Sequence, residues 1–280
     1  MYQVLVYVVL MFLLSACSSG DEGVLYQDPK LVVEGWIEDG DFPVVMVTQN
    51  FPVNKRYQSI DSLDNYVVKW AKVTVDDGET SVVLTGKRDN RYLPPYIYTT
   101  TRLRGKAGRK YTLTVEYKDF LATGITTIPS KPKACKFVIE KCADSDTLFS
   151  LKAILTDDPS EHNYYQFFTR TGTDTRQFLA SYLGTVDDQL WDGNSAIPVY
   201  RGHQLSNDDY TPYFSLQEKI AVKCAQVDSI SYQIWDSYVK TLSLSANMLF
   251  STASNMETNI VGGYGYWCGF GSLTDYLVIK

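Results

Sequence analysis

The sequence predicts a mainly β protein built from two β-sandwich-like domains, of which the second carries one packed α-helix. From residue 31 to residue 128 the chain is a series of short runs rich in β-branched and aromatic residues, separated by turn residues. Residues 128–133 hold two prolines, which interrupt strand pairing and mark a domain boundary. One later segment, residues 231–246, has a helical period. We therefore place the two domains at residues 29–130 and 131–280.

The amino terminus is predicted to be a lipoprotein signal. Residues 4–14 form an apolar run that ends in Ser15, Ala16 and Cys17. The run is too short to cross a membrane as a helix, which takes about 20 residues, and a short apolar core followed by small residues is typical of a secretory signal. Its end, LSAC, resembles the lipobox of bacterial lipoproteins, although no Lys or Arg precedes it. We predict a signal peptide over residues 1–16 and an acylated Cys17; the alternative is an ordinary signal peptide with a chance cysteine.

The segment after Cys17 is polar, and we predict a flexible tether over residues 17–28. Two acyl chains suffice for stable attachment to lipid. The serines and acidic residues of residues 18–22 resemble the surface-export signal of Bacteroidota lipoproteins. We therefore expect a lipid-anchored protein of the outer membrane that faces the cell surface, with outer-membrane lipid as its first partner.

The chain is acidic and rich in aromatic residues. Its formal net charge of −6 and its pI near 5.0 argue against a nucleic-acid partner and against electrostatic attachment to anionic lipid. The β-propensity of aromatic residues accounts for most of the 21 Tyr and 5 Trp.

Four cysteines remain after the lipidation site: Cys135, Cys142, Cys224 and Cys268. An oxidising compartment permits two disulfides among them. Residues 135–142 are predicted to be a strand, whose end cysteines lie roughly 23 Å apart, beyond the ~7 Å Cα limit of a disulfide. We exclude that pair and expect each of the two to bond Cys224 or Cys268, in an order that stays open. A zinc site is disfavoured because the chain has no C-x-x-C spacing.

The strands of the first domain follow from alternation and turn chemistry. In residues 110–117, Tyr111, Leu113 and Val115 alternate with polar residues, which is typical of a strand with one buried face. Asp77 and Gly78 predict a tight hairpin turn. The predicted strand runs are residues 30–38, 44–49, 66–75, 80–86, 110–117 and 122–128. Their number suggests a Greek-key sandwich.

The second domain combines strands with the helix. The strand runs are residues 137–142, 148–157, 163–172 and 274–280, with 177–183 as a further candidate. The helix near residues 231–246 has apolar residues at three- and four-residue steps: Tyr232, Trp235, Val239, Leu242 and Ala246. We expect Ser229 or Ser231 to cap its start and the apolar stripe to pack on the sheet. Residues 262–271 are a glycine-rich segment without a predicted element.

Eight stretches of the chain stand in a characteristic order: residues 31–49, 70–79, 108–117, 122–132, 155–168, 187–202, 230–235 and 258–271. In this order the mature chain resembles, over essentially its whole length, the Bacteroidota lipoproteins known as domain of unknown function 4249. The resemblance implies an outer-membrane lipoprotein whose amino-terminal sandwich is similar to the carboxypeptidase regulatory domain. It also implies a gene that tends to lie beside that of a TonB-dependent receptor. It implies no catalytic residue.

The residue types give little support for catalysis. The chain has two histidines, His162 and His203, both in segments of turn composition, and it has no G-x-S-x-G elbow. We therefore predict that the protein is not an enzyme and takes no cofactor. A hydrolase of unknown class is the second alternative.

The loop at residues 187–195 gathers carboxylates. Asp187, Asp188 and Asp192 are weak candidates for binding Ca²⁺. The loop lacks the alternating spacing of an EF-hand and its terminal Glu. We therefore predict no metal site.

Four aromatic residues lie in turn-rich segments: Tyr96, Trp191, Tyr210 and Tyr213. Aromatic side chains there suit stacking on a glycan, gripping a peptide or contacting another protein. The alternative is that they pack the loops themselves. We take them as candidates for ligand or partner contact.

The sequence favours a surface-exposed, non-enzymatic outer-membrane lipoprotein that is an accessory or ligand-capture partner of a TonB-dependent transporter, with a glycan or peptide as the ligand class. The first alternative is a structural adhesin or fimbria-related subunit. Precursors of fimbrial subunits usually carry a cleavage site that ends in Arg, and residues 18–34 contain no Arg.

Overall fold

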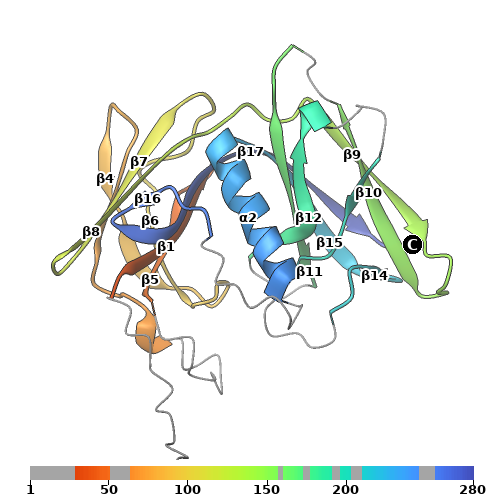
Figure 1. Cartoon of the computed structure of the whole chain (residues 1–280), viewed down its shortest axis with the longest axis horizontal. Coiled ribbons are helices and arrows are strands. Elements are labelled where there is room, and N and C mark those ends of the chain that lie inside the picture. The colour runs from red at the N-terminus through yellow and green to blue at the C-terminus, as the bar shows by residue number, and fades with distance from the viewer. Residues whose placement is uncertain are drawn as a thin grey trace, which may run out of the picture.

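The computed structural model describes most of the chain (Figure 1). The described ranges are residues 29–50, 64–156, 160–172, 177–190, 196–202, 210–245 and 256–280. The signal peptide predicted over residues 1–16, Cys17 and the tether up to residue 28 lie outside them.

The predicted fold class is confirmed, because the described chain is mainly β, with one α-helix. The strands of the first part are β1 (Leu31–Glu38), β2 (Val44–Gln49), β3 (Lys72–Asp76), β4 (Ser81–Val83), β5 (Thr85–Arg88), β6 (Tyr96–Thr99), β7 (Lys110–Tyr117) and β8 (Phe120–Thr127). The second part has β9 (Ala134–Lys141), β10 (Leu148–Thr156), β11 (Tyr164–Thr171), β12 (Leu179–Asp187), β13 (Ile197–Val199), β14 (Phe214–Ser215), β15 (Lys219–Val227), α2 (Ser229–Ser245), β16 (Ile260–Val261) and β17 (Gly263–Val278).

These strands form three sheets. An eight-stranded sheet, in the order β12-β11-β15-β17-β1-β2-β6-β5, extends through both parts of the molecule. A five-stranded sheet, β16-β8-β7-β3-β4, lies at one end, and a four-stranded sheet, β13-β10-β14 with β9 beside β10, lies at the other (Figure 1). The long sheet thus forms one layer of two successive sandwiches.

The long strand β17 connects the two sandwiches. Its first half pairs in parallel with β1, from Leu31↔Gly263 to Glu38↔Phe270. Its second half pairs antiparallel with β15, from Gln226↔Gly271 to Lys219↔Val278. The predicted division at residue 130 therefore differs from the arrangement in space, because Ile260 and Trp267 belong to the core of the first sandwich.

Glycines allow the first half of β17 to approach its neighbours. Gly265 has φ +102°, and a Cβ there would overlap the backbone carbonyl oxygen of Val33. A Cβ at Gly269 would lie 2.7 Å from the Thr127 carbonyl oxygen. The glycine content of residues 262–271 gave no predicted element. In the structure, the same glycines allow a strand to form where the backbone of neighbouring strands leaves no space for side chains.

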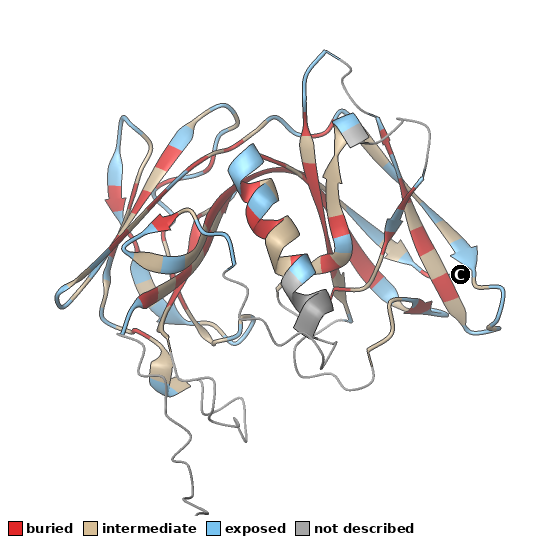
Figure 2. Ribbon diagram, viewed as in Figure 1, coloured by how far each residue is buried: buried red, intermediate tan, exposed pale blue. Residues whose placement is uncertain are grey.

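The two sandwiches have separate cores, and buried residues line their inner faces (Figure 2). The predicted alternation in β7 is confirmed, because Tyr111, Leu113 and Val115 are fully buried in the first core. The second core lies between the four-stranded sheet and the long sheet and includes Leu151 and Phe167.

Helix α2 covers the other face of the long sheet (Figure 1). There Trp235 packs with Phe168 and Phe270. The predicted helix is confirmed, but its cap is neither Ser229 nor Ser231. The carboxylate of Asp228 accepts a 2.8 Å hydrogen bond from the Ser231 amide, which is the N-cap arrangement. The sequence did not indicate Asp228 as the cap, because Ser229 and Ser231 are also cap-forming residues and are nearer to Tyr232, where the apolar stripe begins.

The four cysteines are free, so the structure does not show the two predicted disulfides. Residues 134–141 are extended as β9, which agrees with the exclusion of a bond between Cys135 and Cys142. Cys142 lies just beyond β9, where its amide donates to Leu148, whereas Cys268 is buried beneath α2.

Candidate functional site

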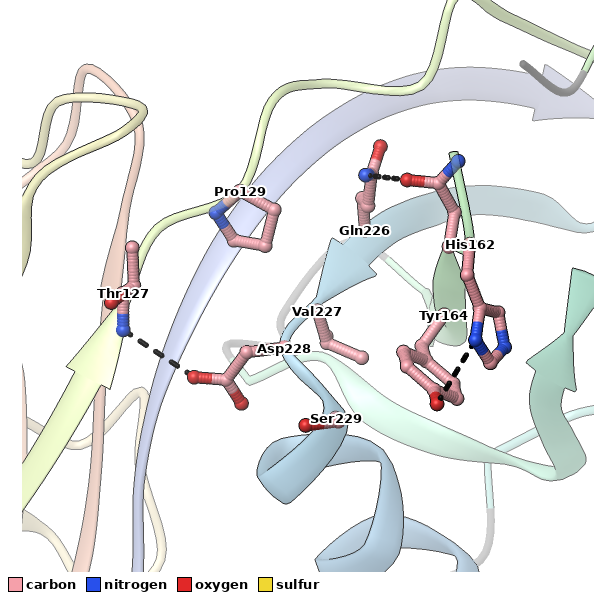
Figure 3. A pocket seen from close by; sticks show the side chains of 9 residues that line it. Thr127, Pro129, His162, Tyr164, Gln226, Val227, Asp228 and Ser229 are labelled. Atoms are coloured by element: carbon pink, nitrogen blue, oxygen red, sulfur yellow. Dashed lines mark hydrogen bonds between the residues drawn. The ribbon is translucent and has the colours of Figure 1, made fainter. Parts of the chain in front are cut away.

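An open pocket of about 330 Å³ lies where the two sandwiches meet (Figure 3). One wall comes from the end of β8 and the chain after it, and the other from β11, the end of β15 and the start of α2. The lining residues are Thr127, Pro129, His162, Asn163, Tyr164, Gln226, Val227, Asp228 and Ser229.

Asp228 joins the two walls of the pocket. One of its carboxylate oxygens accepts hydrogen bonds from the Thr126 hydroxyl at 3.1 Å and from the Thr127 amide at 3.3 Å. The other oxygen caps α2 through Ser231. A single carboxylate thus fixes the helix start against the first sandwich, as Figure 3 shows for Thr127.

Aromatic rings form the wall on the side of the second sandwich. The His162 and Tyr164 rings lie 4.4 Å apart, and the Tyr164 and Tyr232 rings lie 4.8 Å apart. Burial is the main cause that raises the pKa of Tyr232 above its ordinary value, so its hydroxyl stays neutral. Of these three residues His162 and Tyr164 line the pocket, and aromatic rings there suit a flat or partly apolar ligand.

A cluster of His162, Asp187 and Asp188 stands beside the pocket. The Nε2 atom of His162 lies 2.7 Å from an Asp187 oxygen and 3.6 Å from an Asp188 oxygen. The cause is the pairing of Tyr164 with Asp187 in the β11–β12 ladder, which brings the residues before β11 next to those after β12.

These three side chains have the donor atoms of a metal site, and their ligand atoms lie within 4.8 Å of one another. However, each carboxylate already accepts a backbone hydrogen bond, Asp187 from Gln189 at 3.0 Å and Asp188 from Asn163 at 2.6 Å. We interpret the cluster as a hydrogen-bonded support of the pocket wall. Of the predicted Ca²⁺ candidates, Asp187 and Asp188 lie here, and Asp192 lies outside the described residues.

The predicted contact aromatics do not form one site. Tyr96 donates its hydroxyl to the Lys69 carbonyl at 2.9 Å and packs against the first core. Tyr210 donates to the Arg201 carbonyl at 2.8 Å, and burial raises its pKa to about 12. Tyr213 is 36% exposed and lies in the second sandwich, and Trp191, like His203, lies outside the described residues. Tyr96 and Tyr210 therefore stabilise the segments in which they lie, through hydrogen bonds from their hydroxyls to the backbone.

A different apolar surface lies on the outer face of the five-stranded sheet. It consists of Val83, Leu121, Ile125 and Val261, which are 55%, 57%, 53% and 74% exposed. The predicted strands included Val83 and Ile125 but neither Leu121 nor Val261, and alternation does not tell which face of a strand a partner covers.

The ladder pairs place these four residues on one face. Val83 pairs with Thr74, which in turn pairs with Thr114 on its other side. Thr123 then pairs with Thr114 and with Val261. Leu121 and Ile125 lie two residues on either side of Thr123 and therefore point the same way.

A family model described as Domain of unknown function (DUF4249) matches residues 21–274. No curated protein matches the chain. In the part of the chain that the structure describes, no helix is long and apolar enough to span a membrane.

Proposed function

The chain belongs to the family Domain of unknown function (DUF4249), and on this premise we propose that it is a surface lipoprotein of the outer membrane. In this proposal Cys17 carries the lipid, and the protein is a non-enzymatic accessory partner of a TonB-dependent transporter. The lipobox-like LSAC segment supports the anchor. The short tether at residues 17–28 keeps the first sandwich close to the membrane, where a neighbouring barrel presents its outer loops.

The observation that carries the proposal is the exposed outer face of the five-stranded sheet. Four large aliphatic side chains exposed by more than half on one sheet are unusual for a surface that only meets water. Two of the charges on this face, Lys72 and Glu116, form an ion pair of 2.9 Å. Alternation places Asp76 and Lys110 on the same face, at the ends of β3 and β7. The four aliphatic side chains thus lie among threonines and are bordered by charged residues, as the centre of a protein interface is bordered by a polar rim.

Trp70 is a further exposed apolar side chain of the same sandwich. It lies two residues before β3 and is 88% exposed. Tryptophan is the side chain most enriched among residues that dominate protein interfaces. Its exposure supports a partner on this domain, the one that follows the tether directly.

The pocket between the sandwiches supports the ligand-capture part of the proposal. Its volume of about 330 Å³ lies at the lower end of the range for small-molecule sites. A single sugar ring or one peptide side chain fits that size, and the rings of His162 and Tyr164 line the pocket.

Neither alternative function receives comparable support. For a hydrolase, the pair of His162 and Asp187 is the strongest feature. The second ring nitrogen of His162 lies 3.5 Å from the Tyr164 hydroxyl, so its two nitrogens face a carboxylate and a phenol and not the hydroxyl or thiol of a Ser, Thr or Cys nucleophile. The adhesin alternative is separated from the proposal by the experiment below.

The test is co-purification from intact, crosslinked cells. We expect the unchanged chain to bring down one dominant barrel protein. The double variant Leu121→Lys, Ile125→Lys should lower its recovery by about tenfold or more, because charged side chains replace two apolar contacts. The matched control is Ile154→Lys, at a strand residue of the second sandwich that is 48% exposed. This control should leave recovery unchanged.

Two results would contradict the proposal. Equal recovery with the double variant would remove the outer face from the interface. Recovery of self-crosslinked polymers alone would favour the fimbrial alternative.

A further inference from the structure

Two of the free cysteines face each other across the second core. Cys135 lies on β9, in the four-stranded sheet, and Cys224 lies on β15, in the long sheet. Both belong to the second core, where Cys224 is fully buried and Cys135 is half-buried. The Cys135 side chain packs against the cluster that contains Cys224, and the Cys135 thiol is, after burial, a cause that raises the pKa of Cys224.

Neighbouring rings give an independent indication of this geometry. Phe137, two residues after Cys135 and so on the same side of β9, contacts the ring of Phe167 edge-on at 6.5 Å. Phe167 is the direct ladder partner of Cys224. The two sheets are therefore in side-chain contact at the level of Cys135 and Cys224.

The other two cysteines are placed differently. Cys224 and Cys268 lie on opposite faces of the long sheet, because Cys224 belongs to the second core and Cys268 to the cluster under α2. The neighbours of Cys268 are Ser231 and Trp235, and burial is the main cause that raises its pKa to about 12. Cys142 lies outside β9, beside Leu148.

We propose that Cys135 and Cys224 form an inter-sheet disulfide in the exported protein, while Cys142 and Cys268 remain thiols. The proposal assigns a pairing that the sequence left open. It depends on the proposed function only for the oxidising compartment, and the pairing itself is a property of the fold.

The reaction is an ordinary thiol–disulfide exchange. The Cys135 thiolate, on the more accessible side chain, attacks the disulfide of a dithiol oxidase or of oxidised glutathione. The S–S bond of the oxidant breaks, its second sulfur is displaced as a thiolate, and a mixed disulfide forms. Cys224 then attacks the Cys135 sulfur, and the oxidant leaves as a thiol or dithiol. The two cysteines lose two protons and two electrons, which the oxidant takes up. Burial and the Cys135 thiol raise the pKa of Cys224, which leaves the first attack to Cys135; the second step is intramolecular and relies on the position of Cys224 in the same core as Cys135.

The disulfide would attach strand β9, at the edge of the four-stranded sheet, to the long sheet. Among the described strands, β9 pairs with β10 alone. A covalent bond to β15 would tie this edge to the centre of the long sheet and close a long loop, from residue 135 to residue 224.

The experiment uses the mature chain from residue 17 with Cys17→Ser, equilibrated with oxidised and reduced glutathione and then alkylated. Peptide mapping without reduction should find the Cys135 peptide joined to the Cys224 peptide, with Cys142 and Cys268 alkylated. Recovery of Cys135 and Cys224 in alkylated form, or an intramolecular bond through Cys142 or Cys268, would overturn the pairing.

Variants give a second readout. Reductant should lower the denaturant midpoint of the parent chain and of the control Cys142→Ser, and it should leave Cys135→Ser unchanged. An equal response of all three to reductant would overturn the proposal.

The same peptide map, made on chain isolated from membranes, distinguishes the failure of the disulfide pairing from the failure of the proposed function. A bond that forms with glutathione but is missing there would contradict export and leave the pairing intact.

Discussion

Asp228 is the residue at which the pocket, the helix and the first sandwich meet. Its carboxylate accepts hydrogen bonds from Thr126, Thr127 and Ser231, two of them across the junction of the sandwiches. Tyr96 and Tyr210 have a similar structural role elsewhere, because each donates a hydrogen bond from its hydroxyl to a backbone carbonyl. The sequence placed these two tyrosines in turn-rich segments but gave no sign that the hydroxyls were already bound.

We predict that Asp228→Ala destabilises the protein by about 2–3 kcal/mol. About 1 kcal/mol comes from the lost helix cap, and the remainder from the two unpaired donors of β8. The control is Asp236→Ala on the same helix, whose exposed pair with Lys240 contributes about 0.3–0.5 kcal/mol. Urea unfolding measures both; equal effects of the two substitutions would contradict the role of Asp228.

Strand β17 and helix α2 show what a sequence pattern does and does not predict at the scale of an element. Tyr232, Trp235 and Val239 follow a period of 3.6, and they face the sheet in the structure as predicted. The first half of β17 was missed because its glycines resemble a loop. Glycine is required in β17 because the backbone of Val33 and of Thr127 lies too close for a side chain. Both residues are distant from β17 in the chain, so the local sequence does not reveal this requirement.

The close packing of β17 predicts that alanine substitution lowers the stability of the protein more at Gly265 than at Gly108. Gly265→Ala should cost at least about 3 kcal/mol, because the added Cβ meets the Val33 carbonyl and φ is +102°. Gly108→Ala is the control, because Gly108 also has positive φ, at +80°, but no atom within 4 Å of the added Cβ. There we expect only about 1–2 kcal/mol. Thermal or urea unfolding compares the two, and a similar loss in both would contradict the close approach of β17 to β1.

At the scale of the whole molecule, the two sandwiches share one sheet and a buried ion pair. Lys223 of β15 pairs with Glu38 of β1, and Ser272 of β17 donates to the same carboxylate. Lys223 is only 8% exposed, so the pair belongs to the interior of the junction. The prolines near residue 130 predict a division there, whereas the return of residues 256–270 to the first sandwich depends on long-range pairing that no local pattern contains.

The proposed function depends on an anchor at Cys17, and the most direct measurement is fatty-acid labelling of the chain in growing cells, followed by fractionation. We predict that the unchanged chain incorporates the label and fractionates with the outer membrane. Cys17→Ala should incorporate none and accumulate as unprocessed precursor or released protein. If Cys17→Ala still carries the label and still fractionates with the outer membrane, the lipid anchor at Cys17 is wrong, and with it the placement of the apolar face beside a membrane partner.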